Sequence, residues 1–395
     1  MRDGTWDAPE GAPNRSKKGL VATIAIAAIA LVAVVIAFQR YGGEDDPLTT
    51  ATTSGTEPLV DPDDIISGGP PPDGIPPIDE PKFLSIAEVD FLEPQEPVVS
   101  LVIEDDARAY PLQIMTWHEI ANDTVGGVPV TVTFCPLCNT AYAFEQPEIE
   151  GEITTFGTSG KLYNSNLVMY DRATESLWPQ ALGQAVIGPL TGTTLERVPS
   201  QIVSWEEFRT SFPDGKVLSR DTGHVRSYGR NPYPGYDEVG SMPFLFKGEV
   251  DGRLAAVERI LGVETENEKF AFPYFALEKA ATDGAAAINS EVGGVPILVV
   301  WKAGAVSALD DASIAASKEV GAAFAFSRAM DGRVLSFDVT DGQIVDRQTK
   351  STWNIFGHAN SGPLDGQRLE AANAHDSFWF DWAAFHPDTR VWGGE

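Results

Sequence analysis

Residues 126–145, GGVPVTVTFCPLCNTAYAFE, contain the pattern that decides the fold. Residues 128–134 and 140–145 are rich in β-branched and aromatic side chains with partial alternation, which is typical of strands. Gly-Gly, Asp-Gly and Gly-Pro pairs separate similar runs elsewhere in the chain, and such pairs favour turns. The sequence therefore predicts a mainly β fold.

The same pattern returns later as GGVPILVVW at residues 293–301, within a longer series of matches. The matched segments, in order, are 109–111 with 271–273, 126–130 with 293–297, 171–178 with 346–353, 188–190 with 362–364, and 205–214 with 379–388. Several matches in one order indicate an internal duplication. We predict two β-rich repeats, 83–225 and 245–395, joined by a linker at 226–244. In the second repeat, residues 295–301 and 334–339 are expected to match the two strands of the first.

Helices are expected to be few and short. Residues 112–121 predict one, because Pro111 precedes them and proline favours the first turn of a helix. Residues 204–212 predict another, with Ser204 as N-cap and Glu207 three residues later, the spacing of a capping box.

The pattern Asp-Arg-x-Thr-x-Ser-x-Trp occurs in both repeats, at residues 171–178 and 346–353. Because both copies have kept it, we interpret it as part of the scaffold. We expect Asp171 to pair with Arg172 and Trp178 to fill a core.

Residues 19–38 form an uncharged apolar run that is long enough to cross a bilayer as a helix. Arg15, Lys17 and Lys18 precede it and acidic residues follow it, so the positive-inside rule predicts a cytoplasmic tail (1–18), a single-pass membrane anchor and an extracytoplasmic body. A cleaved signal peptide is the alternative, but its apolar region is usually shorter and ends at a small-residue site. Residues 39–82 are rich in Pro, Gly and Asp and predict an extracytoplasmic linker.

The chain has 395 residues and a formal charge of −29. Such an acidic protein repels phosphate backbones, so we expect no nucleic-acid partner.

Three residues of the first repeat have no counterpart in the second. Cys135 and Cys138 align with Lys302 and Ala305, and His118 aligns with Ala280. Their joint absence is what the loss of one shared site would produce. We therefore predict a site at Cys135, Cys138 and His118.

Three interpretations of this Cys-x-x-Cys remain open. Cys135, Cys138 and His118 could hold a soft metal, zinc or copper, with Met115 one helical turn away as a further ligand. The cysteines could instead perform thiol–disulfide chemistry, although a strand rather than a helix follows them and the helix dipole that lowers a thiol pKa is missing. They could also form a structural disulfide in a non-enzymatic binding module. The metal hypothesis ranks first, and the sequence does not settle whether the protein is an enzyme.

Four segments resemble a known bacterial family. They are WHEIAND at 117–123, FCPLCNTA at 134–141, SGKLYNS at 159–165 and MYDR at 169–172. Together they resemble domain of unknown function 3179, and the resemblance covers nearly all of 83–395. It implies a secreted or membrane-anchored bacterial protein and implies no particular activity. The second repeat departs from the family pattern at the cysteines.

Overall fold

The structure is a computed structural model, and it describes residues 57–393. The predicted cytoplasmic tail and membrane span lie outside the described residues. Within 57–393, no helix has the length and apolar character needed to cross a bilayer.

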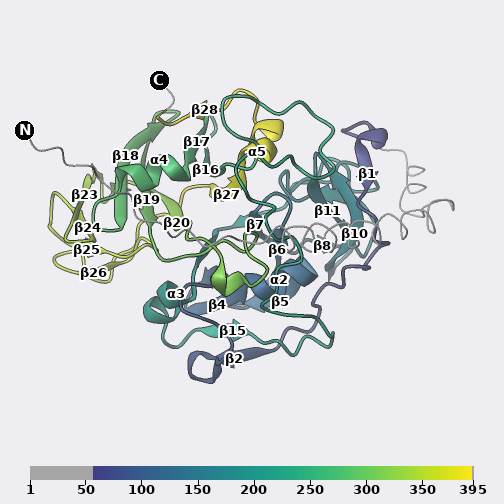
Figure 1. Cartoon of the computed structure of the whole chain (residues 1–395), viewed down its shortest axis with the longest axis horizontal. Coiled ribbons are helices and arrows are strands. Elements are labelled where there is room, and N and C mark those ends of the chain that lie inside the picture. The colour runs from purple at the N-terminus through teal and green to yellow at the C-terminus, as the bar shows by residue number, and fades with distance from the viewer. Residues whose placement is uncertain (1–56, 394–395) are drawn as a thin grey trace, which may run out of the picture. The chain divides into compact units, whose positions relative to one another are not determined.

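The fold is mainly β, as predicted, and the described residues contain four α-helices of seven residues each (Figure 1). The first part of the chain contains η2 (Pro62–Asp64), β1 (Ile65–Ser67), β2 (Phe83–Ser85), η3 (Ile86–Glu88), β3 (Pro97–Ile103), β4 (Asp106–Pro111), α2 (Leu112–His118), β5 (Ile120–Val125), β6 (Val128–Cys135), β7 (Thr140–Glu145), β8 (Glu148–Ile149), β9 (Glu152–Ile153), β10 (Phe156–Tyr163), β11 (Asn166–Asp171), β12 (Leu177–Pro179), β13 (Arg197–Val198), β14 (Ser200–Ser204), α3 (Trp205–Ser211) and β15 (Lys216–Leu218).

The second part contains β16 (Arg259–Glu264), β17 (Lys269–Pro273), α4 (Tyr274–Ala280), β18 (Ala285–Val292), β19 (Val295–Lys302), η4 (Ile314–Ala316), β20 (Ala322–Ser327), β21 (Ala329–Met330), β22 (Arg333–Val334), β23 (Phe337–Thr340), β24 (Gln343–Asp346), β25 (Thr352–Trp353), β26 (Ala359–Ser361), β27 (Ala374–Phe378), α5 (Trp379–Phe385) and β28 (Arg390–Val391).

The two repeats follow the same topology. The sheet β14-β3-β4-β15 of the first corresponds to β27-β16-β17-β28 of the second, and in each sheet the last pair is parallel. The antiparallel sheet β5-β6-β7 corresponds to β18-β19-β20, and β10-β11-β12 corresponds to β23-β24-β25. The shared order of elements matches the duplication inferred from the sequence.

The C-terminal helix of each repeat packs on strands of its own repeat and also lies beside a core that it shares with the other repeat. Phe378 and Phe380, at the start of α5, are buried in the core that contains the cysteines of the first repeat. Trp205 and Phe208 of α3 are buried with Leu298 and Val300 of β19 in the second. Each of these two cores therefore contains apolar side chains from both repeats.

Three expectations need correction. Helix α2 ends at His118 rather than at residue 121, because Glu119 adopts a left-handed φ of 58° and the chain continues as β5. The second-repeat equivalent of β7 is β20, not residues 334–339, because a long loop (303–321) separates it from β19. Finally, the described part of the predicted linker packs on the body: β1 pairs with β10, and Ile78 is buried.

The repeated Asp-Arg-x-Thr-x-Ser-x-Trp pattern is scaffold. The buried carboxylate of Asp171 accepts hydrogen bonds from the backbone and hydroxyl of Thr174, the backbone of Ser176 and the indole of Trp178. Asp346 accepts the same four bonds in the second repeat. Arg172 does not pair with Asp171 as expected; it pairs with Asp73 and Asp79.

Candidate dithiol site

The two cysteines lie at a tight turn between β6 and β7. The backbone N–H of Cys138 donates to the carbonyl of Cys135 at 3.3 Å, and Asn139 closes the loop with a φ of 53°, a conformation that asparagine tolerates better than most residues. Cys135 then pairs with Thr140 across the hairpin. This turn directs both side chains into the core, where both thiols are free and buried.

A second hairpin and the second repeat complete the surroundings of the sulfurs. The carbonyl oxygen of Ser165, at the turn between β10 and β11, lies 3.5 Å from Cys138 Sγ and 4.0 Å from Cys135 Sγ. The Cys138 thiol also interacts electrostatically with the Cys135 thiol and with the carboxyl of Asp381 on α5. The first repeat thus provides the sulfurs and the second provides a carboxyl.

Asp381 is held in place by hydrogen bonds from both repeats. Asn166 Nδ2 donates to its Oδ1 at 3.1 Å, and Ser377 Oγ donates to its Oδ2 at 3.1 Å. The backbone N–H of Phe378 also donates to the carbonyl of Cys138 at 2.8 Å, which docks the start of α5 on the cysteine turn.

Burial controls the protonation of this site. It raises the pKa of the Cys138 thiol well above its usual range, and the hydrogen bond to Cys135 and the charge of Asp381 act in the same direction. Burial also raises the pKa of Asp381 to about 7, against the opposing hydrogen bonds from Cys138, Ser377 and Asn166. A protonated thiol therefore faces a carboxyl that titrates near neutral pH.

The equivalent place in the other repeat holds an ion pair. Lys302 aligns with Cys135, and Glu207 of α3 aligns with Asp381. Lys302 Nζ donates to the carboxylate of Glu207, again across the two repeats. The duplication therefore produced two related loci, and only one of them contains thiols.

Glu119 is a second buried acid near Cys135. Its side chain forms no hydrogen bond or ion pair within residues 57–393, and burial raises its pKa to about 8. The hydroxyl of Tyr233, whose pKa is raised mainly by burial, interacts electrostatically with both Glu119 and Cys135. A φ of 58° is uncommon for a glutamate, and such backbone outliers are often found at functional sites.

His118 does not join the cysteines in a ligand set. Its Nδ1 donates to the carbonyl of Pro76 at 2.7 Å, and its Nε2 lies 2.6 Å from the hydroxyl of Tyr228. Burial lowers the pKa of His118 to about 4, so the ring is neutral and Nε2 accepts from Tyr228. A metal at Nε2 would have to displace that hydroxyl.

No group of three or more His, Cys, Asp or Glu side chains within 57–393 is arranged to hold a metal ion. Met115 is fully buried in the core that also contains the cysteines. The predicted ligand set of Cys135, Cys138 and His118 is therefore not assembled, because both nitrogens of His118 are engaged elsewhere. Zinc or copper binding by these residues stays a prediction.

We expect His118→Ala to lower the free energy of unfolding by about 2 kcal/mol at neutral pH, because it removes a fully buried ring, takes the donor from the carbonyl of Pro76 and leaves the Tyr228 hydroxyl with Thr222 alone. The folded pKa is lowered from 6.5 to about 4. This contribution is therefore complete above pH 6.5 and is lost as the pH falls towards 4. Denaturant unfolding at both pH values measures the deficit. An equal deficit at both would contradict a neutral His118.

A family model described as "Protein of unknown function (DUF3179)" matches residues 72–389. The chain belongs to this family. The match covers the first repeat, the second as far as residue 389, and every residue of the dithiol site, and it confirms the resemblance seen in the sequence. No curated protein and no solved structure matches the chain.

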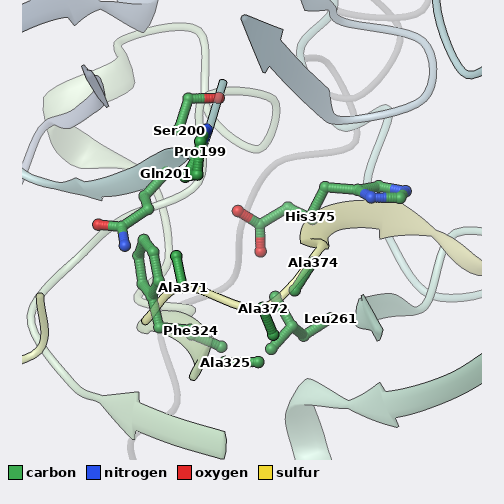
Figure 2. A pocket seen from close by; sticks show the side chains of 12 residues that line it. Pro199, Ser200, Gln201, Leu261, Phe324, Ala325, Ala371, Ala372, Ala374 and His375 are labelled. Atoms are coloured by element: carbon green, nitrogen blue, oxygen red, sulfur yellow. The ribbon is translucent and has the colours of Figure 1, made fainter. Parts of the chain in front are cut away.

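A cavity of about 290 Å³ lies at the junction of the two repeats in this DUF3179 protein, lined by residues from β7, β13, β14 and β27. Figure 2 shows the smaller cavity beside it, which shares Pro199, Ser200 and His375 with the first. Its walls are mainly alanine and other small side chains, and the imidazole of His375 points away from its centre. Tyr142, which lines the larger cavity, interacts electrostatically with Asp381 and Cys138. The cavity therefore adjoins the dithiol site without containing its sulfurs.

Sequence reasoning missed Asp381, Glu119 and Ser165. Asp381 could have been found from the duplication itself, because aligning Trp205 with Trp379 places it opposite Glu207. Glu119 follows His118 directly, but its left-handed backbone has no signal in the sequence. Ser165 belongs to the SGKLYNS segment that supports the family resemblance.

Proposed function

We propose that this protein performs thiol–disulfide exchange with Cys135 and Cys138, and that Asp381 handles the proton of Cys138. The observation that carries the proposal is the pair of free, buried thiols next to the buried carboxyl of Asp381, which interacts electrostatically with Cys138. A thiol whose pKa is raised needs a base, and a carboxyl with a pKa of about 7 is well matched to that task at neutral pH.

The exchange balances as two substitutions at sulfur. Cys135 loses its proton as its sulfur attacks the disulfide of an oxidised partner and forms a mixed disulfide; the partner S–S bond breaks, and the released partner sulfur leaves as a thiol with that proton. Asp381 then accepts the proton of Cys138, whose sulfur attacks Cys135 Sγ. The Cys135–Cys138 disulfide forms, the second partner thiol leaves with the proton, and the partner disulfide is reduced by two electrons. In reverse, the same steps reduce the protein.

The predicted anchor at 19–38 fits this proposal. If the span orients the body outward, the dithiol faces an oxidising compartment in which disulfides form and persist. The anchor and the extracytoplasmic location remain part of the proposal.

The full-length reduced protein, mixed with a small aromatic disulfide, is expected to lose both free thiols and to form an internal Cys135–Cys138 disulfide, seen by mass spectrometry as the loss of two hydrogen atoms. Cys138→Ser should stop at a mixed disulfide on Cys135, because no second thiol can resolve it. Glu207→Gln, at the equivalent locus of the other repeat, is the control and should close the disulfide normally.

Two outcomes would contradict the proposal. One is a pair of thiols that never forms the internal disulfide. The other is zinc or copper that copurifies with the wild type and disappears from Cys135→Ser/Cys138→Ser, which would favour the metal hypothesis.

A further inference from the structure

An irregular segment covers the dithiol site. Residues 233–246, here called the strap, belong to the long connection between β15 and β16 that contains no named helix or strand. Leu245 and Phe246 pack on the core that contains both cysteines, and the ring of Phe246 meets that of Phe380 edge-on at 5.2 Å. The Tyr236 ring packs beside Phe378. The sulfurs are buried in part because the strap lies over them.

The two ends of the strap differ in how they are held. At its start, Gly235 N–H donates to the carbonyl of Asp310, and the buried carboxylate of Asp237 pairs with Arg259 and Lys318. Further along, the backbone is tied to the body at Phe244, whose carbonyl accepts from Ser165 Oγ at 2.5 Å. The segment over the sulfurs is therefore held to the body mainly by the hydrogen bond from the Ser165 hydroxyl to the Phe244 carbonyl and by apolar contacts.

The second half of the strap, residues 239–246, contains a strained residue and exposes apolar side chains to solvent. Leu245 has a φ of 55°, a conformation that a leucine side chain rarely adopts. Val239, Met242 and Phe244 are exposed by 71%, 74% and 43%. Strain favours release of the segment, and exposed apolar side chains beside a buried site are typical of a docking surface.

We propose that the strap is a displaceable cover, and that an extended polypeptide carrying a disulfide takes its place over Cys135 and Cys138. This inference rests on the proposed exchange function. The strap holds its place through groups that any polypeptide supplies: a main-chain carbonyl for Ser165 and apolar side chains for the surface at Phe380. A small disulfide has neither group, so it reacts only when the strap opens by itself and therefore reacts more slowly than a polypeptide.

The cover is tested by the alkylation rate of the native reduced full-length protein with iodoacetamide. We expect Phe246→Ala to raise this rate about tenfold, because it removes the ring that anchors the strap. Ser165→Ala, which deletes only the hydroxyl that holds Phe244, should raise it about fivefold. Phe275→Ala, an exposed phenylalanine of α4, is the control and should leave the rate unchanged. Unchanged rates in both strap variants would overturn the cover.

The partner class is tested with two thionitrobenzoate mixed disulfides, one of N-acetylcysteine and one of an unstructured peptide with apolar residues around its cysteine. We expect the wild type to release thionitrobenzoate at least about tenfold faster from the peptide, and Phe246→Ala to lose this preference. Equal rates in the wild type would overturn the polypeptide class. If neither compound exchanges while both strap variants alkylate faster, the exchange function fails and the cover stands.

Discussion

Asp381→Asn is expected to slow closure of the Cys135–Cys138 disulfide by about 100-fold at neutral pH, the lower end of what a positioned acid–base group contributes. The amide keeps the size, its oxygen accepts from Asn166 and its NH2 group donates to Ser377 Oγ, but it cannot accept the proton of Cys138. Stopped-flow release of thionitrobenzoate in the second step measures the effect. The first step, attack by Cys135, should be nearly unchanged.

The same variant should become more stable, which separates a chemical role from structural damage. The folded state raises the pKa of Asp381 from 3.8 to about 7. A raised carboxyl pKa means that the wild type loses stability as the pH climbs from 3.8 to 7, whereas the asparagine variant does not. The variant should therefore unfold at higher denaturant than the wild type above pH 7, and the difference should vanish near pH 4.

Asp376→Asn is the matched control, because burial raises the pKa of Asp376 to about 7 as well, but its carboxyl bonds to Tyr274 rather than to a thiol. It should leave the closure rate intact. An equal slowing in both variants, or none in Asp381→Asn, would refute the role given to Asp381.

Asp171→Ala is expected to cost about 3–5 kcal/mol of unfolding free energy, among the largest effects that one buried position produces. The carboxylate satisfies four donors at 2.6–3.1 Å, including the indole of the fully buried Trp178. Alanine would leave these donors buried without an acceptor and would open a void beside the ring.

The duplication provides an internal replicate and a control. Asp346→Ala should cost a similar amount, because Asp346 holds Thr349, Ser351 and Trp353 in the same way. Asp338→Ala, which breaks the exposed ion pair with Arg347, should have a far smaller effect on the free energy of unfolding, because exposed ion pairs contribute little. Urea denaturation measures all three. Costs of similar size for Asp338 and Asp346 would show that the repeated motif is not a structural centre.

The sequence predicts local features of this fold better than contacts between distant segments. Strand β7 is observed at the predicted bounds, and Ser204 caps α3 as expected, since its hydroxyl accepts from the N–H of Glu207. These features depend on neighbours within a few residues. The end of α2 depends on the positive φ of Glu119, which neither the hydrophobic periodicity nor the helix propensity of the sequence reveals.

The candidate site shows the same limit. Comparing the repeats singled out Cys135, Cys138 and His118, and the structure brings only the two cysteines together. His118 instead meets Pro76 and Tyr228, which lie far away in the chain and in segments that the sequence marks as linkers. Asp381 escaped notice because its carboxyl meets Asn166 and Cys138 of the other repeat, a contact between distant segments that no local pattern encodes.

The division of the dithiol site between the two repeats has a consequence for how such a protein could arise. A single ancestral copy could not have completed a site by itself, since the sulfurs and the acid come from different copies; it would have needed a twin, and the symmetric pair would have held two equal centres. Once the two copies were fused into one polypeptide, a second identical chain was no longer needed. One of the two sites could then lose its cysteines and acquire the Lys302–Glu207 ion pair, which only stabilises the structure, while the other site kept its thiols.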